Sequence, residues 1–349
     1  MQSSADSKTI VAQAPCRADL AGGTLDLWPL YLFHPGAVTV NFALNIMTTC
    51  RITPRSGSGI TLRSLDTKKE EHYASLEELN RAKQPKHCLG VQLVKYFAPE
   101  GGFLLETDSE SPAGAGISGS SALMIAATAA LARFTGRKLS LEEMRTIAQN
   151  VEAQLIQVPT GCQDYYPALY GGANSIHLDP SGIRREKIAV SEEEIDSRFI
   201  VVYTGAPRQS GINNWEVFKS HINGDKKVVK NFENISSIAQ GMHRALGKSD
   251  WDEVAHLLRE EWKLRRSNYD GISTPLIDRL VAVASKSGGR AAKVCGAGGG
   301  GCVLFMVKDG AKDRVIEALR INGGEVLPCK MSPEGLVVKT QAASKAARA

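Results

Sequence analysis

Apolar and polar positions alternate in short runs along the first third of the chain. Five runs of four to seven residues lie at 10–14, 37–43, 47–52, 59–62 and 103–106, and polar turns separate most of them. Short apolar runs bounded by turn signals predict β-strands. A longer polar stretch lies between the fourth run and the fifth. The pattern therefore predicts a strand-rich N-terminal region.

Two helices are predicted to follow these strands. The first covers about residues 121–133. The second begins with a capping box, because Ser140 precedes Glu143 by three residues. An apolar stripe with helical spacing follows, at Leu141, Met144, Ile147, Ala148, Val151 and Leu155.

The second half of the chain mixes both patterns. Strands are predicted at 173–178, 199–204 and 301–307, and helices at about 226–246, 250–268, 274–287 and 311–321. The turn at 179–182, Asp-Pro-Ser-Gly, indicates a domain boundary nearby. The small, charged tail at 340–349 is expected to fray. We therefore predict an α+β chain of two domains, covering residues 1–185 and 186–349.

Composition narrows the class of protein. Hydrophobic residues make up 43% of the chain and charged residues 23%, as in a globular protein. The longest largely apolar run, 122–132, has 11 residues, whereas a membrane span needs about 20. The N-terminal residues carry no signal-peptide pattern. A cytoplasmic location without membrane association is expected.

Charge distribution and the spacing of cysteine and histidine argue against a nucleic-acid-binding protein and a transition-metal protein. The net charge is +5, but basic residues are interleaved with acidic ones, as at 68–71 and 259–261, so a nucleic-acid partner is not expected. The seven cysteines contain no Cys-x-x-Cys pair, and the seven histidines contain no His-x-x-x-His pair. Reduced thiols are expected, and nothing in these patterns indicates a transition metal. A monomer and a homodimer both remain open.

Glycine is concentrated where chemistry is expected. Thirteen of the 33 glycines lie in four windows, 14–29, 112–122, 161–172 and 293–302. Glycine allows backbone to adopt positive φ or to approach a ligand closely. These windows are therefore the candidate functional segments.

The window at 112–122, Pro-Ala-Gly-Ala-Gly-Ile-Ser-Gly-Ser-Ser-Ala, leads into the first predicted helix. Free amides of a glycine-rich loop and of a helix N-terminus form an anion site, for which phosphate is the natural ligand. Gly114, Gly116 and Gly119 also satisfy G-x-G-x-x-G, the dinucleotide-binding pattern of an oxidoreductase. The strand that should follow that motif's helix is missing, and the chain has no Walker A sequence, so neither of those nucleotide-binding folds is favoured. The alternative to a phosphate site is that residues 112–122 are only a tight loop of small residues packed on the helix.

The other windows supply complementary parts. Residues 293–302 contain four consecutive glycines before a strand, which favours close approach of a ligand or of the 112–122 loop. The third window follows the helix that carries Glu152 and contains Asp164, and carboxylates can bind Mg²⁺ or position an acceptor hydroxyl. The first window contains Arg17, a cation suited to the charge of a transferring phosphate.

Together and in this order, the four windows resemble those of the GHMP kinase superfamily. Residues 14–26 are similar to its first motif, 112–122 to its phosphate loop P-x-x-x-G-L-x-S-S-A, and 293–302 to its third motif, K-x-x-G-A-G-G-G-G. The resemblance covers nearly the whole chain. It implies an N-terminal lobe like domain 2 of ribosomal protein S5, a ferredoxin-like C-terminal lobe with its glycine loop at 296–301, and ATP with Mg²⁺ between them.

The resemblance also implies roles for single residues. Asp164 would be the catalytic carboxylate with Arg17 beside it, and Ser121 and Glu152 would hold Mg²⁺. The implied nucleotide-binding residues are Pro112, Gly114, Ala115, Gly116, Ser118, Gly119, Ser120 and Ser121. The implied substrate-binding residues are Gly22, Gly23, Asp26, Gly298 and Gly299.

The implied reaction is transfer of the γ-phosphoryl of ATP to a hydroxyl of a sugar or sugar phosphate. Gly161-Cys-Gln-Asp164 and Arg17-Ala-Asp-Leu-Ala-Gly-Gly23 look most like fucokinase and heptose 7-phosphate kinase, although the loop before Asp26 differs from the usual heptose-kinase form. Arg208, Lys263 and Arg266 are candidates for binding a sugar phosphate. A mevalonate-branch alcohol kinase and a galactokinase-like sensor without turnover remain alternatives.

Overall fold

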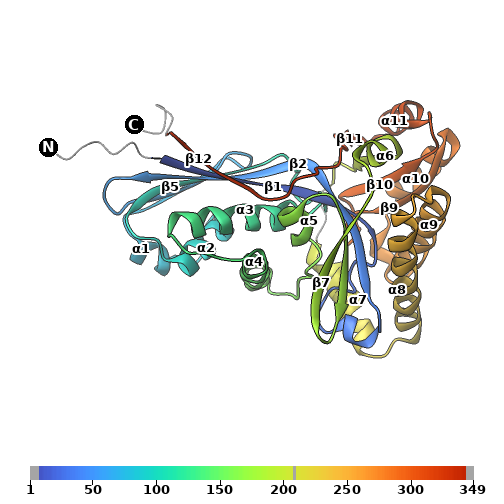
Figure 1. Ribbon diagram of the computed structural model, residues 1–349, viewed down its shortest axis with the longest axis horizontal. Helices are drawn as coiled ribbons and strands as arrows, with labels where there is room; N and C mark the ends of the chain where they lie inside the picture. Colours follow the sequence, from blue (N-terminus) through green and yellow to red (C-terminus); the bar gives the residue numbers. More distant parts are fainter. Residues whose placement is uncertain (1–7, 207–209, 343–349) are drawn as a thin grey trace.

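The structure is a computed structural model that describes residues 8–206 and 210–342. Its described residues form two β-sheets, each covered by helices (Figure 1). Strands β1, β2, β5 and β12 of the first sheet lie toward one end of the molecule, and the second sheet lies toward the other end. Helices and largely antiparallel strands agree with the predicted α+β class.

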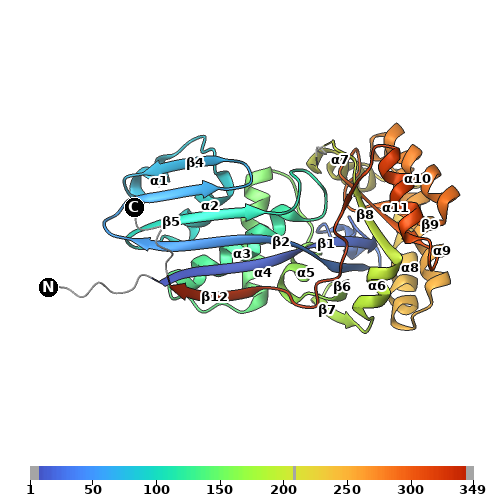
Figure 2. The ribbon, with the colours of Figure 1, turned by 90° about the horizontal axis from the view of Figure 1, so that it is seen from above.

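The first sheet has the strand order β12-β1-β2-β5-β3-β4, with the β6–β7 hairpin attached to β2. All pairings are antiparallel except that of β3 with β5. Figure 2 shows β12 beside β1 at one edge and β4 at the other. The strand bounds are Lys8–Ala21 (β1), Val38–Arg55 (β2), Ile60–Ser64 (β3), Lys69–Tyr73 (β4), Gly102–Ser109 (β5), Ala173–Asp179 (β6), Gly182–Ile188 (β7) and Val337–Ala342 (β12).

Five helices pack on one face of this sheet (Figure 1). They are α1 (Leu76–Arg81), α2 (Cys88–Phe97), α3 (Gly119–Phe134), α4 (Leu141–Ile156) and α5 (Tyr165–Tyr170). Helix α3 contacts β1 and β2 as well as α2, α4 and α5. Its sequence is apolar on nearly all sides, as expected for a helix enclosed by other elements. This enclosure fixes the N-terminus of α3 beside the end of the sheet.

The second sheet has the order β11-β8-β10-β9 and is entirely antiparallel. Its strands are β8 (Phe199–Tyr203), β9 (Gly289–Val294), β10 (Cys302–Val307) and β11 (Glu325–Leu327). The helices of this part are α6 (Glu192–Arg198), α7 (Ser210–Ile222), α8 (Lys226–Gly247), α9 (Trp251–Arg266), α10 (Pro275–Ser287) and α11 (Lys312–Ile321). Two short 3-10 helices, Leu30–Phe33 and Asp270–Ile272, complete the described elements.

Most predicted elements are present, with several differences. The predicted strands at 37–43 and 47–52 form one continuous strand, β2. Strand β4 and helices α1 and α2 lie in the stretch predicted to be a polar connection. Elements that were not predicted elsewhere in the chain are α5, α6, α7, β7, β9, β11 and β12. Residues 340–342, expected to fray, belong to β12, and the rest of that tail lies outside the described residues.

The turn at 179–182 joins the two strands of a hairpin. Strand β7 therefore crosses the predicted boundary between residues 185 and 186, and β12 returns from the C-terminal region to pair with β1. The division of the chain at that point stays a prediction.

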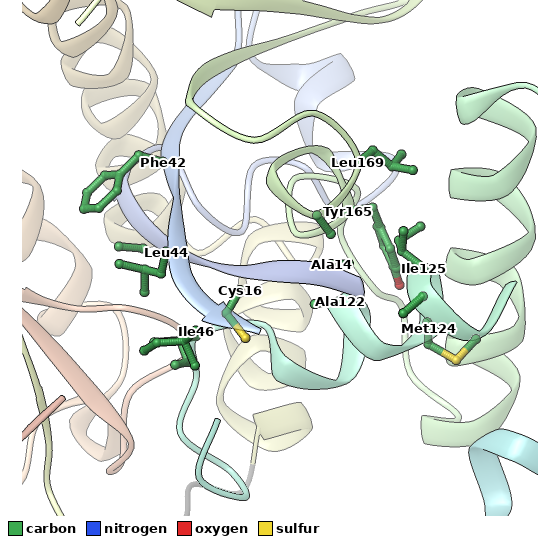
Figure 3. Close-up of a cluster of buried hydrophobic side chains, with 14 of the residues drawn as sticks. Ala14, Cys16, Phe42, Leu44, Ile46, Ala122, Met124, Ile125, Tyr165 and Leu169 are labelled. Atoms are coloured by element: carbon green, nitrogen blue, oxygen red, sulfur yellow. The ribbon is translucent and has the colours of Figure 1, made fainter. Parts of the chain in front are cut away.

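A continuous apolar core joins the two parts of the molecule. Figure 3 shows side chains from β1, β2, α3 and α5 within it, including Phe42 and Tyr165. Phe42 on β2 is fully buried and packs against Phe199 of β8, with ring centroids 5.6 Å apart. The two sheets therefore share buried apolar surface.

We expect Phe42→Ala to lower the free energy of unfolding by about 3–5 kcal/mol, because it leaves a cavity where the two sheets meet. Ile321→Ala is a control, because Ile321 is 73% exposed and its truncation should change stability by less than about 0.5 kcal/mol. Urea unfolding followed by circular dichroism measures both. Equal stability of the two variants would contradict the expectation.

Candidate functional site

One cavity of about 510 Å³ brings together most of the residues predicted to be functional. Its walls come from β1, the loop before α3, the first turns of α3, the end of α4, the loop before α5, and α9. The predicted residues that line it are Arg17, Gly23, Asp26, Pro112, Gly114, Ala115, Gly116, Ser118, Gly119, Ser120, Ser121, Glu152 and Asp164.

Three predicted substrate-binding glycines do not line this cavity. A Cβ at Gly22 would lie 2.1 Å from the carbonyl oxygen of Val38, and one at Gly298 would lie 2.3 Å from that of Ile272. The amide of Gly299 donates a hydrogen bond to the same Ile272 oxygen, at 2.9 Å. These glycines allow close packing against neighbouring backbone instead of facing the cavity.

The loop before α3 presents backbone amides at a helix N-terminus. Gly114 and Gly116 both have positive φ, and Ser118, in the left-handed region, occupies the N-cap position. Within the described part of the chain, the Ser118 side chain makes no capping bond, its buried hydroxyl has no partner, and the first turn of α3 holds no acidic residue. Uncapped amides at the positive end of a helix dipole form an anion site.

The glycine-rich segment before β10 packs against the loop before α3. The amide of Cys302 donates to the carbonyl oxygen of Ala115 at 2.6 Å. A Cβ at Gly301 would lie 2.7 Å from that same oxygen. Gly301 has φ of +73°, so both its conformation and its contact favour glycine. The expected close approach of the two glycine windows is therefore present.

A buried carboxylate lies next to the first turn of α3. Glu152 of α4 accepts hydrogen bonds from Ser120 Oγ (2.6 Å), Ser121 Oγ (2.9 Å) and Tyr165 Oη (2.5 Å). Burial raises the pKa of Glu152 above its ordinary value. A carboxylate flanked by serine hydroxyls beside an anion site is a donor set that suits Mg²⁺, which prefers oxygen ligands. The residues present therefore fit the ion that the resemblance implies.

Arg17 and Asp164 form an ion pair at the cavity. Arg17 Nε lies 2.9 Å and its Nη2 lies 2.8 Å from Asp164 Oδ1. The guanidinium is only 3% exposed, whereas the Asp164 side chain is 26% exposed at the N-terminus of α5. Arg17 thus fixes the carboxylate from the protein side and leaves it accessible from the cavity.

Asp26 lies in the same cavity, near Asp164. Its Oδ2 accepts a hydrogen bond from the amide of Gln163, the residue before Asp164, at 2.9 Å. A Cβ at Gly161 would lie 1.9 Å from this oxygen, so the Asp26 carboxylate requires glycine at that position. Burial, with a smaller contribution from Asp164, raises the pKa of Asp26 to about 7.

A buried ion network that includes two cavity-lining residues, Asp19 and Arg265, was not predicted. Lys293 Nζ lies 2.5 Å from Asp19 Oδ2 and 3.9 Å from Glu261 Oε2, and Glu261 also pairs with Arg265. Arg265 donates to the carbonyl oxygen of Gly23 at 2.8 Å. Lys293 and Asp19 lie in two of the glycine windows, but no pattern linked them to each other or to α9. The i, i+4 spacing of Glu261 and Arg265 does not distinguish a buried pair from a surface pair.

The cations suggested for a sugar phosphate do not line the cavity in the part of the chain that the structure describes. Lys263 is exposed beside Glu260, and Arg266 is exposed beside Asp278. Arg208 lies outside the described residues. The basic residue of α9 that faces the cavity is Arg265.

The raised pKa of Asp26 predicts a pH-dependent stability. The ordinary pKa of this carboxyl group is 3.8, so between pH 3.8 and pH 7 the unfolded chain releases the carboxyl proton while the folded protein keeps it. The free energy of unfolding therefore falls as pH rises, by up to about 1.4 kcal/mol per pH unit. Asp26→Asn should remove this contribution. Urea unfolding of both proteins between pH 4 and 8 measures the difference, and identical pH profiles would contradict the assignment.

Comparison with known proteins agrees with this geometry. Residues 85–172 match the family model for the GHMP kinases N terminal domain, and residues 242–325 match that for the GHMP kinases C terminal domain. The chain is 27% identical over 340 residues to the D-glycero-alpha-D-manno-heptose 7-phosphate kinase of Campylobacter jejuni, covering 94% of this chain and 98% of that protein.

Solved structures show the same fold. A D-glycero-D-manno-heptose 1-phosphate kinase from Bacteroides thetaiotaomicron is 22% identical with a TM-score of 0.77, over 95% of this chain and 98% of its own. The galactokinase of Lactococcus lactis, solved with galactose, is 18% identical with a TM-score of 0.78, over 94% of this chain and 95% of its own. No described helix has the length and apolar character of a membrane span. With both domains matched and the predicted fold confirmed, the chain belongs to the GHMP kinase superfamily.

Proposed function

We propose that this protein is an ATP-dependent kinase that transfers the γ-phosphoryl of Mg-ATP to a hydroxyl of a sugar or sugar phosphate. The observation that carries the proposal is the convergence, in one cavity, of an uncapped helix N-terminus, a buried carboxylate with two serine hydroxyls, and the Arg17–Asp164 pair. Phosphoryl transfer depends mainly on positioning and on charge stabilisation, and these three parts supply both.

The nucleotide phosphates would bind at the loop 112–118 and the first turn of α3, where the free amides and the helix dipole favour anions. Ser121 and Glu152 would hold Mg²⁺ next to those phosphates. When bound, Mg²⁺ neutralises charge on the phosphate oxygens. Arg17 adds a fixed positive charge at the same end of the cavity.

The acceptor hydroxyl would bind at Asp164. Its carboxylate can accept the hydrogen bond of that hydroxyl, and so orient it and take its proton as the new bond to phosphorus forms. The ion pair with Arg17 prevents the carboxylate from turning away. Asp26, Gly23 and Thr24 line the adjacent wall, and polar groups there are suited to sugar hydroxyls.

For the acceptor we propose a heptose 7-phosphate or a fucose-like sugar. The alignment with the Campylobacter jejuni heptose 7-phosphate kinase, over nearly the full length of both chains, supports the first. A relative from Arabidopsis thaliana, a bifunctional fucokinase/GDP-fucose pyrophosphorylase, supports the second. It is 25% identical over 86% of this chain, and the match covers 30% of that longer protein.

We expect Asp164→Asn to lower kcat by about 10²–10⁴-fold while nucleotide affinity stays nearly unchanged, because the amide cannot take the proton of the acceptor. Steady-state phosphorylation assays and titration with a fluorescent ATP analogue measure the two quantities. Asp313→Asn, an exposed change on α11, is the matched control and should leave both unchanged. Full turnover in Asp164→Asn would refute the assigned role.

A coupled ATP-consumption assay over heptose 7-phosphate, free heptose, fucose, galactose, glucuronic acid and mevalonate tests the acceptor class. We expect turnover with heptose 7-phosphate or fucose to exceed that with mevalonate by at least tenfold, because Asp26 and the Gly23–Thr24 backbone offer hydrogen bonds that only a polyhydroxylated acceptor uses. Turnover with mevalonate alone would contradict the sugar assignment, and no turnover with any acceptor would favour a ligand sensor.

A further inference from the structure

Three potential metal ligands lie together outside the cavity. His177 on β6, Glu186 on β7 and His243 on α8 each direct one ligand atom into a cluster in which all three atoms are within 4.8 Å of one another. Helix α8 contacts β7, and Figure 2 shows α8 close to the β6–β7 hairpin. The ligands therefore come from two strands of the first sheet and a helix of the C-terminal region.

Strand register explains why two of the ligands share a face. Ser175 lies opposite Glu186 and His177 lies opposite Arg184 in the antiparallel β6–β7 ladder. Residues directly opposite each other, and those two apart on one strand, project from the same side of a sheet. Ser175, His177, Arg184 and Glu186 thus all face α8, which contributes His243.

The two oxygens of Glu186 face different imidazoles. Oε2 lies 3.1 Å from His177 Nε2, and Oε1 lies 3.7 Å from His243 Nε2. The second distance is too long for a hydrogen bond. Two ligand atoms on a tetrahedral Zn²⁺, each about 2.1 Å from the ion, lie roughly 3.4 Å apart, between these two values. Each of these oxygen–nitrogen distances is close to that between two ligands of one ion, and the full set of three ligand atoms lies within 4.8 Å.

One ligand is also fixed by a neighbour. Ser175 Oγ lies 2.8 Å from His243 Nδ1, which leaves Nε2 of that ring directed at Glu186. Histidine ligands of metals commonly use their other nitrogen in this way.

The residues in and around the cluster favour a transition-metal ion as its ligand. Arg184 Nη1 lies 3.5 Å from Glu186 Oε2, but its side chain is 64% exposed and is able to turn into solvent. The donor set is two imidazoles and one carboxylate, which favours Zn²⁺ or a similar transition metal over Mg²⁺. His177 and His243 are each about one quarter exposed, so water can complete a fourth position.

We propose that His177, Glu186 and His243 form a binding site for one Zn²⁺ ion or a similar divalent transition metal. The ion joins the β6–β7 hairpin to α8. One turn earlier on α8, Ala239 packs behind Gly22, where a Cβ would lie 3.1 Å from the Ala239 Cβ. A bound ion would therefore restrain α8, which packs against the segment between Gly22 and Asp26. The site is independent of the proposed kinase activity and shares no residue with it.

The test is metal binding to the full-length protein after treatment with a chelator. Isothermal titration with Zn²⁺ is performed with millimolar Mg²⁺ present, which occupies the oxygen-ligand site at Glu152. We expect one Zn²⁺ per chain and a rise in Tm on binding. We also expect Co²⁺ to give the visible absorption bands of nitrogen and oxygen coordination. Absence of stoichiometric binding to the wild-type protein overturns the proposal, whatever the variants do.

Single variants locate the ion. His177→Ala and His243→Ala should each weaken Zn²⁺ binding by at least tenfold and abolish the Tm rise. His72→Ala is the matched control, because His72 pairs with Glu70 on an exposed hairpin without a second histidine. Cys88→Ser removes the exposed thiol. Both controls should bind as the wild type does. Undiminished binding in both His177→Ala and His243→Ala, or its loss in Cys88→Ser, would overturn the assignment.

Discussion

The buried guanidinium of Arg17 holds the four glycine windows in one arrangement. It lies on β1 in the first window and donates to the carbonyl oxygens of Gly116 (2.8 Å) and Cys295 (2.7 Å) and to Asp164 (2.9 Å). A buried charge is tolerated only when its hydrogen-bonding capacity is satisfied. The phosphate loop, the candidate catalytic carboxylate and the glycine segment before β10 must therefore stay close to β1.

A buried network of four charged residues holds another part of the cavity wall. Lys293, Asp19, Glu261 and Arg265 have exposed side-chain fractions of 7% or less, and together they balance two positive and two negative charges. Through Arg265 this network reaches the carbonyl oxygen of Gly23, and so it positions the segment that carries Asp26. Arg17 thus anchors the phosphate loop and Asp164, and Arg265 anchors the segment before Asp26.

Contacts between the N-terminal and C-terminal parts of the chain hold these walls together. Phe42 packs on Phe199, β12 returns to pair with β1, and α8 contacts β7 of the β6–β7 hairpin. The His177–Glu186–His243 cluster lies at the last of these contacts. A metal there would add a bond between elements that are otherwise joined by packing and hydrogen bonds.

Local patterns predicted a large part of this molecule. Apolar periodicity located β1, β2, α3, α4, the strands of the second sheet other than β9 and β11, and the long helices α8, α9 and α10. It missed β4, whose residues Lys69–Tyr73 are nearly all polar because the strand lies at the edge of the sheet. Helix α2 was missed because its buried face, including Val91 and Phe97, follows a polar connection and spans only ten residues.

The sequence by itself determined where phosphate chemistry is expected, because positive φ at glycine and an uncapped helix start are local properties of the backbone. Only the tertiary structure decided which residues face the cavity. Gly298 and Gly299 turn toward Ile272, and Arg265, which no motif marked, faces the cavity from α9. The same holds for the raised pKa of Asp26 and for the histidine cluster, whose His177 and His243 are 66 residues apart. Burial and the meeting of distant elements arise from folding, and spacing along the chain does not encode them.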